Sequence, residues 1–331
     1  MSAIQLSVVV EKLRLAAPFR ISGYVMEEQT VIVVELRDGV HRGRGEASGV
    51  YYLGDTADKL AAQVEGHRGA IESGIDRASL QQLLPPGGAR NAVDCALWEL
   101  DASRNGVAAW KLAGLRSLNP LVTTFTIGAD DPAVMADGAR KYAQARCLKL
   151  KLTGDVDQDI ARVRAVRAAR PGVWMGVDAN QGYTLGALDA LMGELVRADV
   201  ALLEQPLARG READLEGFAS PIPIAADESA LGLGDVPGLV GRFNIVNIKL
   251  DKCGGLTEGL AIAQRARELG LGVMVGNMVG TSLAMAPGFI LGQLCDVVDL
   301  DGPIFLSRDR IPGAVYADGR IQCGEEVWGS A

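Results

Sequence analysis

Short apolar runs recur along residues 120 to 300 of this chain, and helix-like segments separate them. The runs lie near residues 124, 150, 175, 202, 224, 247, 273 and 297. Two parallel strands need a crossover connection between them, usually a helix, so this alternation predicts a parallel sheet with helices between its strands. Eight such units close into a (β/α)8-type barrel, which is the predicted α/β fold.

A charged residue ends each of five successive runs. Lys151, Asp178, Glu204, Asp227 and Lys249 follow one another at intervals of 22 to 27 residues. Because active sites of such barrels lie at the C-terminal ends of the strands, we expect these five side chains to surround one point. An open doubly wound sheet also binds ligands at its strand ends, but it does not easily bring five consecutive strands around one point.

The three acidic residues of this series predict a metal site. Asp178, Glu204 and Asp227 offer carboxylate oxygens, which are the ligands that Mg²⁺ prefers, with Mn²⁺ as a possible substitute. The alternative is three unrelated acids at helix N-termini, where acidic side chains are favoured in any case. Their regular spacing favours one Mg²⁺ per subunit.

The two lysines of the series end the second and the sixth of eight strands, and these positions face each other across a barrel. Lys151 and Lys249 could then act as general bases on opposite faces of a bound carbon acid, which gives a 1,1-proton transfer that inverts a stereocentre. Lys149 shares a strand face with Lys151 and adds positive charge beside a substrate carboxylate. The alternative is that the lysines serve only as counter-ions for the acids.

A further pair of acids ends the eighth run. Asp299 and Asp301 are two residues apart, so they share a strand face and point toward the same site. An ammonium group on the substrate is the natural partner for two carboxylates in a closed site. The alternative is a helix cap before Gly302 and Pro303.

The N-terminal part has another pattern, in which strands come first and helices follow. Strands are predicted near residues 7–13, 30–36 and 41–47, and helices over 56–73 and 90–104. This order predicts an α+β capping domain and no βαβ unit.

We therefore expect a capping domain over residues 1–118, a barrel over 119–310 and a tail over 311–331 that returns to the capping domain. Residues 17–25 join the first two strands, and their Pro and Gly favour a loop that acts as a lid over the site.

Composition narrows the possible partners. The net charge of −8 argues against nucleic acid and anionic membranes. The sequence contains no apolar run long enough to span a membrane and no signal-peptide pattern at Met1. The five cysteines lack metal-ligand spacing and are expected to be buried thiols in a reducing cytoplasm. We expect a cytoplasmic homo-oligomer that acts on a small molecule.

The charged motifs resemble those of the enolase superfamily, in its muconate-lactonizing-enzyme subgroup, in which a lysine base works with Mg²⁺. The resemblance covers nearly the whole chain. Its motifs are Lys149-Leu150-Lys151, Asp178-Ala179-Asn180, Glu204-Gln205-Pro206, Asp227-Glu228-Ser229 and Lys249-Leu250-Asp251-Lys252-Cys253-Gly254-Gly255. It implies metal ligands at Asp178, Glu204 and Asp227, acid/base lysines at Lys151 and Lys249, and supporting roles for Asn180, Glu228 and Asp251.

Within the subgroup, Asp299-Leu300-Asp301-Gly302-Pro303 resembles the dipeptide epimerases, in which such an Asp pair holds the substrate ammonium. This implies epimerisation of an L,L-dipeptide at its C-terminal residue. Relatives that act on alanyl-glutamate often have a basic lid residue. Tyr24 takes the comparable place here and Arg20 lies nearby, so an apolar or mixed dipeptide fits equally well. Met278 is a further candidate for substrate contact.

Other activities of the superfamily stay open as alternatives: N-acylamino-acid racemisation, o-succinylbenzoate synthesis and muconate cycloisomerisation. They use the same lysines but have no need for a paired acid at the ammonium. A sugar-acid dehydratase would need a barrel histidine, whereas His41 and His67 both lie in the capping part. A metal-binding barrel without catalytic activity is the non-enzyme alternative.

Overall fold

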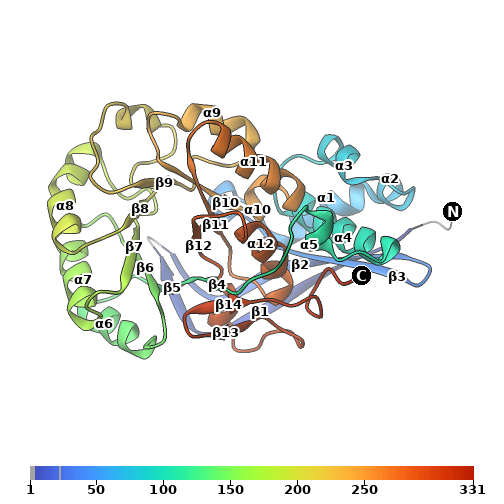
Figure 1. Cartoon of the computed structure of the whole chain (residues 1–331), viewed down its shortest axis with the longest axis horizontal. Coiled ribbons are helices and arrows are strands. Elements are labelled where there is room, and N and C mark those ends of the chain that lie inside the picture. The colour runs from blue at the N-terminus through green and yellow to red at the C-terminus, as the bar shows by residue number, and fades with distance from the viewer. Residues whose placement is uncertain (1–3, 22–23) are drawn as a thin grey trace.

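The computed structural model describes residues 4–21 and 24–331, and its largest sheet is a barrel of eight parallel strands. The strands follow one another in sequence order, each paired with the next, and surround a common axis (Figure 1). This confirms the predicted barrel. The strands are β5 (Thr124–Ile127), β6 (Cys147–Lys151), β7 (Trp174–Asp178), β8 (Leu202–Glu204), β9 (Ile224–Ala226), β10 (Ile245–Lys249), β11 (Gly272–Gly276) and β12 (Val297–Val298).

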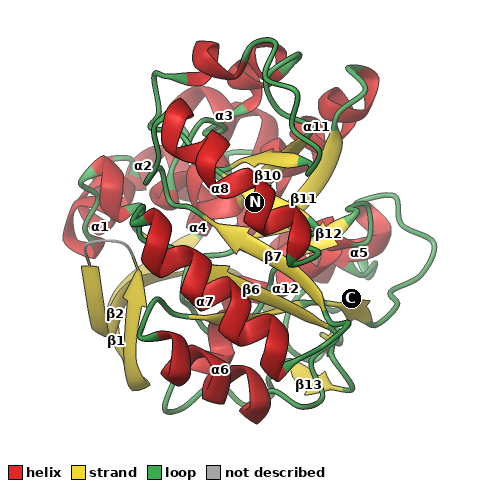
Figure 2. Ribbon diagram, turned by 90° about the vertical axis from the view of Figure 1, so that its left-hand side faces the viewer, coloured by secondary structure: helices red, strands yellow, loops and turns green. Residues whose placement is uncertain are grey.

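Helices cover the outside of the barrel, and Figure 2 shows three of them, α6, α7 and α8, lying across the strands. The barrel helices are α6 (Pro132–Lys141), α7 (Val156–Ala169), α8 (Leu185–Arg197), α9 (Val236–Leu239), α10 (Leu250–Cys253), α11 (Leu256–Glu268) and α12 (Ser282–Gly292). The expected helix between every pair of strands is wrong at one place, because only the short 3₁₀ helix η2 (Glu212–Leu215) separates β8 from β9. Among the described residues after β12 the only helical segment is the 3₁₀ helix η4 (Gly302–Phe305), so the eighth unit lacks a regular helix.

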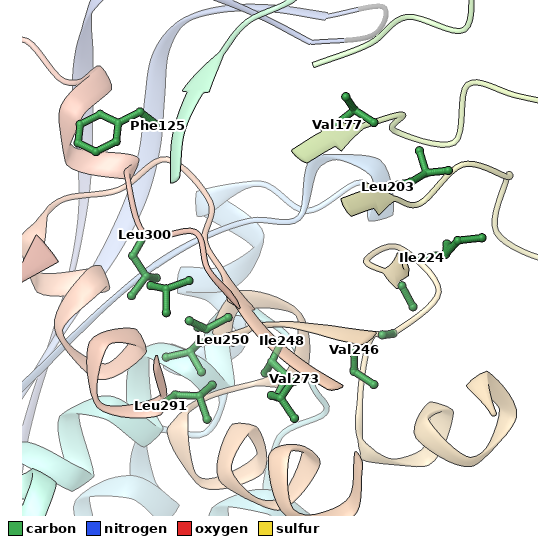
Figure 3. Close-up of a cluster of buried hydrophobic side chains, with 14 of the residues drawn as sticks. Phe125, Val177, Leu203, Ile224, Val246, Ile248, Leu250, Val273, Leu291 and Leu300 are labelled. Carbon is green, nitrogen blue, oxygen red and sulfur yellow. The ribbon is translucent and has the colours of Figure 1, made fainter. Parts of the chain in front are cut away.

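Side chains alternate along each barrel strand, and this alternation separates the packing residues from the site residues. Val177 and Leu203 are fully buried in the apolar layer of the fold (Figure 3). The next residues, Asp178 and Glu204, therefore point to the opposite face, into the barrel. The apolar packing between strands and helices thus fixes where the two carboxylates point.

The barrel closes through side chains. In the described part of the chain, no backbone ladder joins β5 to β12. The hydroxyl of Thr124 donates a hydrogen bond to Asp299, and the backbone N–H of Thr126 donates to Asp301 Oδ2 at 2.7 Å. The two acids that end the eighth strand therefore also bridge the seam of the barrel.

The capping domain is an antiparallel three-stranded sheet covered by helices, as predicted. Its strands are β1 (Gln5–Ile21), β2 (Tyr24–Asp38) and β3 (His41–Ser48), and its helical segments are η1 (Tyr51–Leu53), α1 (Ala57–Gly66), α2 (Arg68–Glu72), α3 (Arg77–Leu83), α4 (Gly88–Asn105) and α5 (Ala109–Leu112). The single helix expected over 56–73 is wrong, because His67 interrupts it between α1 and α2.

Glycine lets α4 approach β3 closely. A Cβ atom added to Gly45 would lie 2.0 Å from the carbonyl oxygen of Ala92, and one added to Gly43 would lie 2.0 Å from that of Ala96. Only a residue without a side chain fits such a contact. The two glycines therefore fix how the longest helix of the capping domain lies on its sheet.

The loop expected over residues 17–25 is wrong, because the chain forms a long hairpin there. β1 continues to Ile21 and β2 begins at Tyr24, while residues 22 and 23 lie outside the described residues. Pro18 is tolerated because β1 is an edge strand and its register is irregular between Arg14 and Phe19. Pro18 therefore lies at an irregular stretch of an edge strand and does not interrupt the hairpin.

The hairpin rests on two loops of the barrel. Ala129 N donates to Arg20 O at 3.0 Å, beyond β5, and Ser307 N donates to Arg14 O at 2.9 Å, beyond β12. These backbone contacts hold the hairpin over the C-terminal ends of the barrel strands.

The last residues contact both parts of the fold. β13 (Val315–Ala317) pairs with β14 (Arg320–Gln322), which pairs with β4 (Leu121–Val122) ahead of the barrel. Trp328 Nε1 then donates to Arg44 O at 2.8 Å, and Gly329 N donates to Glu99 Oε1 at 3.1 Å. Across the described ranges, none of the helices has the length and hydropathy that a membrane crossing requires.

Candidate active site

Three carboxylates from neighbouring strand ends meet inside the barrel. Asp178 ends β7, Glu204 ends β8 and Asp227 directly follows β9. Each offers one oxygen, and these oxygens all lie within 4.8 Å of one another. All three residues are 0–1% exposed. This donor set, made only of carboxylate oxygens, fits one divalent cation such as Mg²⁺.

Burial and neighbouring charges shift the pKa values of these three acids in different directions. Burial alone would raise the pKa of Asp178, but Lys151 and Lys149 outweigh it and hold the pKa below its usual value. The pKa of Asp227 is likewise lowered, against the effect of burial, by Lys249 and Lys252.

Glu204 differs from the other two acids. Burial, and the negative charge of Asp178, raise its pKa to about 7. Lys149 Nζ lies 2.8 Å from Glu204 Oε2, but Lys149 and Lys249 together do not offset the effects that raise the pKa. Glu204 is therefore the acid of the cluster whose charged form the lysines stabilise least, and a bound cation would favour that charged form.

The two lysines predicted to be acid/base groups lie in the same cavity. Lys151 ends β6 and its Nζ contacts Asp178 Oδ2 at 2.6 Å. Lys249 ends β10 and its Nζ contacts Asp227 Oδ2 at 2.6 Å. Burial would lower the pKa of Lys249, but Asp227 more than compensates and raises it. Since β6 and β10 are four strands apart in the barrel, the lysines approach the acids from different sides.

Lys149 lies between the metal cluster and the acids of the eighth strand. Its Nζ contacts Asp299 Oδ2 at 2.7 Å, Glu204 at 2.8 Å and Asp178 at 3.3 Å. Burial would raise the pKa of Asp299, but Lys149 keeps it low, whereas burial and Asp299 raise the pKa of Asp301 to about 6. The structure thus brings Lys149, Asp299 and Asp301 to the site, although Asp299 already has an internal partner.

The three supporting residues lie in different surroundings. Asn180 has a φ of 43°, and its backbone N–H donates to Asp178 Oδ1 at 3.0 Å. Glu228 is buried at the cavity wall. Asp251 instead faces the capping domain, where its Oδ1 accepts a hydrogen bond from Ser48 N at 2.9 Å. Asp251 thus joins the barrel to the capping domain.

The structure places the other predicted substrate-contact residues, Met278, Arg20 and Tyr24, in different positions relative to the cavity. Met278 lines the cavity. Arg20 is half exposed, its Nε lies 3.6 Å from Asp130 Oδ2, and it is absent from the described lining of the cavity. Tyr24 begins β2, but its side chain lies outside what the structure describes.

Two residues that form hydrogen bonds with the metal-site acids were not predicted from the sequence. Asn247 Nδ2 donates to Glu204 Oε1 at 2.7 Å, and Lys252 Nζ donates to Asp227 Oδ1 at 2.6 Å. Asn247 lies two residues before Lys249 on the same strand, so its strand face was a usable signal. Lys252 comes from the first turn after the strand, where spacing alone does not give its direction.

A cavity of about 410 Å³ lies between the barrel mouth and the capping domain. The three lysines Lys149, Lys151 and Lys249 line its barrel side, together with the two acids of the eighth strand. Among the described residues of its lining, Tyr52 and Glu228 each have a buried side-chain oxygen without a hydrogen-bond partner. Such a cavity, with charged groups at one end, suits a small polar molecule.

Family comparisons agree with this architecture. Residues 3–114 match the model described as "Mandelate racemase / muconate lactonizing enzyme, N-terminal domain", and residues 134–321 match "Enolase C-terminal domain-like". The chain belongs to this mandelate racemase and muconate lactonizing enzyme family of the enolase superfamily.

Three curated relatives are similar over most of their length. The L-Ala-D/L-Glu epimerase of Escherichia coli K12 is 38% identical, over 93% of this chain and 96% of that protein. The hydrophobic dipeptide epimerase of Roseobacter litoralis is 35% identical, over 91% of each protein. The N-acetyl-D-glutamate racemase of a Pseudoalteromonas species is 38% identical, over 78% and 81%. They confirm the predicted class of enzyme, an isomerase acting on amino acid derivatives.

Solved structures are equally similar. An enolase family member from Agrobacterium tumefaciens, with bound sodium and L-Ala-L-Glu, has a TM-score of 0.95 and 39% identity over 98% of this chain and 100% of that one. The dipeptide epimerase of Methylococcus capsulatus, complexed with Mg and L-Arg-D-Lys, has a TM-score of 0.91 and 31% identity over 98% of each chain. Together with the buried carboxylates, such complexes support the predicted Mg²⁺.

Proposed function

We propose that this protein epimerises an L,L-dipeptide at its C-terminal residue by 1,1-proton transfer, with Lys151 and Lys249 as the opposed acid/base groups. The observation that carries the proposal is that both lysines, from strands on different sides of the barrel, line one cavity and contact the same carboxylate cluster. Relatives that act on dipeptides support the substrate class.

Each lysine has one role in each direction of the reaction. A neutral Nζ on one side takes the proton from the substrate α-carbon, and the ammonium on the other side returns a proton to the opposite face. The α-carbon is inverted, the two lysines exchange protonation states, and the reverse reaction restores them. Asp178, Glu204 and Asp227 would hold Mg²⁺, which supplies positive charge where the substrate carboxylate gains negative charge.

The remaining polar groups would orient the dipeptide. Asp301 lines the cavity together with Asp299, and its carboxylate would bind the substrate ammonium. Lys149 would exchange part of its contact with Asp299 for the substrate carboxylate. The unpartnered groups of Tyr52 and Glu228 offer further hydrogen bonds to the peptide unit.

The test is hydrogen exchange at the α-carbon in D₂O. We expect the wild-type enzyme to incorporate deuterium into L,L-dipeptides from a library, read by mass spectrometry. Lys151→Ala should lose this exchange by about 10²-fold or more, since positioned acid/base groups contribute that much. Lys12→Ala is a matched control, because Lys12 is an exposed lysine of the capping domain. Exchange at the wild-type rate in Lys151→Ala would contradict its role as a base.

N-acylamino-acid racemisation is the second candidate, and the Pseudoalteromonas relative favours it. The acid pair distinguishes the two activities. If Asp299 and Asp301 bind an ammonium, N-acetylation of the dipeptide should remove most of the turnover. Equal rates on the acetylated and the free dipeptide would assign the protein to the N-acyl substrates.

A further inference from the structure

Five apolar side chains from the hairpin and from two barrel loops line the cavity. Phe19 and Met26 of the hairpin, Met278 and Val279 after β11, and Phe305 of η4 all line it. All five are only partly buried, so each exposes apolar surface to the cavity. We call these five residues the apolar wall.

The hairpin holds its part of the apolar wall in a fixed register. Phe19 and Met26 are directly opposite each other across β1 and β2, so their side chains share one face of the hairpin. The rings of Phe19 and Phe305 lie 4.5 Å apart between centroids. This contact joins the hairpin to the end of the eighth barrel strand, and it completes the wall from both domains.

The cationic side chains of the cavity lining all come from the barrel strands β6 and β10. In the described lining, Lys149, Lys151 and Lys249 are the cationic side chains, and each contacts a carboxylate of the site. The undescribed residues 22 and 23 are Ser and Gly, which add no charge. Three acids of the capping domain, Glu28, Asp55 and Asp58, also line the cavity. A carboxylate placed beside the apolar wall would therefore be desolvated without a cation to pair with it.

We propose that the apolar wall binds an apolar side chain of the dipeptide and excludes glutamate, so that the substrate class is apolar L,L-dipeptides. This inference rests on the proposed dipeptide epimerase function. Burial of a leucine or phenylalanine side chain against the five wall residues is favourable, whereas a glutamate side chain would lose its hydration at the same place. A positive charge introduced at Met26 would pair with a substrate carboxylate and would reverse the preference for an apolar side chain.

The first experiment compares three substrates that differ only in the C-terminal side chain: L-Ala-L-Phe, L-Ala-L-Glu and L-Ala-L-Lys. The rate of α-deuterium incorporation with saturating Mg²⁺ gives kcat/KM for each. We expect L-Ala-L-Phe to exceed both charged dipeptides by about 10-fold or more, the size of discrimination that apolar contacts provide.

The second experiment adds a cation to the wall. Met26→Arg should shift the ratio of kcat/KM for L-Ala-L-Glu over L-Ala-L-Phe by about 10-fold or more in favour of glutamate. Val25→Arg is the matched control, because it adds the same charge on the neighbouring residue, which is 48% exposed and points to the other face. This control should leave the ratio within about twofold of the wild type, as expected for a charge in solvent.

The outcomes separate the inference from the proposed function. Deuterium incorporation into L-Ala-L-Glu at a rate equal to or above that of L-Ala-L-Phe would overturn the apolar preference while the epimerase function stands. A preference for L-Ala-L-Lys would also overturn the apolar preference, because the capping-domain acids that line the cavity would then determine which side chain is bound. A failure to exchange with any L,L-dipeptide would overturn the proposed function and the inference together.

Discussion

Replacing Arg310 by methionine tests the ion pair that joins Glu46 of the capping domain to the segment after η4. Glu46 on β3 has a completely buried side chain and accepts hydrogen bonds from Arg310 Nε at 3.0 Å and Nη2 at 2.8 Å. Its remaining donors are the backbone N–H and the hydroxyl of Thr281, the N-cap residue of α12. The loop before Thr281 contains Met278, so this pair also supports the apolar wall.

The expected loss follows from the charge that the variant leaves behind. Removal of one partner of a buried ion pair costs about 3–5 kcal/mol, because the other charge stays desolvated and unpaired. Thr281 keeps two hydrogen bonds on Glu46, and the Arg310 side chain is 28% exposed, so we expect the lower end, about 3 kcal/mol. The double variant Glu46→Gln with Arg310→Met removes the charge as well and should recover about half of this loss.

The loss should also depend on pH. Burial raises the pKa of Glu46, and Arg310 opposes this rise, so the variant should raise the pKa further. A carboxyl group whose pKa is higher in the folded than in the unfolded state loses stability as the pH rises from about 4.3 through the folded value. The variant should therefore be closest to the wild type near pH 5 and furthest from it near pH 8.

Urea unfolding followed by circular dichroism at pH 5 and pH 8 measures both effects, with the exposed Arg140→Met as a control for loss of an arginine. A loss in free energy of unfolding below about 1 kcal/mol, or one that is equal at the two pH values, would refute the reasoning for Arg310.

Three further predictions concern other parts of the fold. Gly45→Ala should destabilise the protein by about 2 kcal/mol or more, because its Cβ would overlap the Ala92 carbonyl; an unchanged midpoint in urea would contradict this contact. Burial raises the pKa of Asp251 to about 7, although hydrogen bonds from Ser48 and Asn91 lower it, so the stability of the wild type should fall between about pH 4 and pH 7. Asp251→Asn should flatten this fall, measured as the Tm in thermal unfolding curves over that pH range. An unchanged dependence of the Tm on pH would argue against the raised pKa of Asp251. Chelation should remove epimerase activity and lower the Tm, and Mg²⁺ should restore both; full activity in excess chelator would exclude the metal site.

The barrel and the placement of its charged residues could be predicted because they depend on local patterns. Each strand is apolar, and the residue at its end lies at a position that the fold defines. The sequence indicated Lys151 and Asp178 as neighbours for this reason, and the structure places their charged atoms 2.6 Å apart. The same alternation gave the shared face of Asp299 and Asp301.

What could not be predicted depends on contacts between distant segments. The resemblance implied a supporting role for Asp251, but no pattern in the sequence indicated that the helical turn after β10 directs its side chain to Ser48 of the capping domain. The hairpin over residues 17–25 looked like a loop because Pro18 and Gly23 favour turns, whereas the edge position of β1 tolerates the proline. The aromatic contact between Phe19 and Phe305 joins residues almost 300 positions apart, and no spacing rule indicates it.

The side-chain seam between β5 and β12 has a consequence for how this enzyme can change. Asp299 and Asp301 hold the first and last strands together through Thr124 and Thr126, so a change at either acid alters the closure of the barrel as well as the proposed substrate site. A change of substrate specificity is therefore easier to obtain by substitutions in the hairpin and its neighbouring loops, because these substitutions leave the closure of the barrel intact. In the proposed site, selectivity and architecture are separable at Met26, and they are inseparable at the two aspartates.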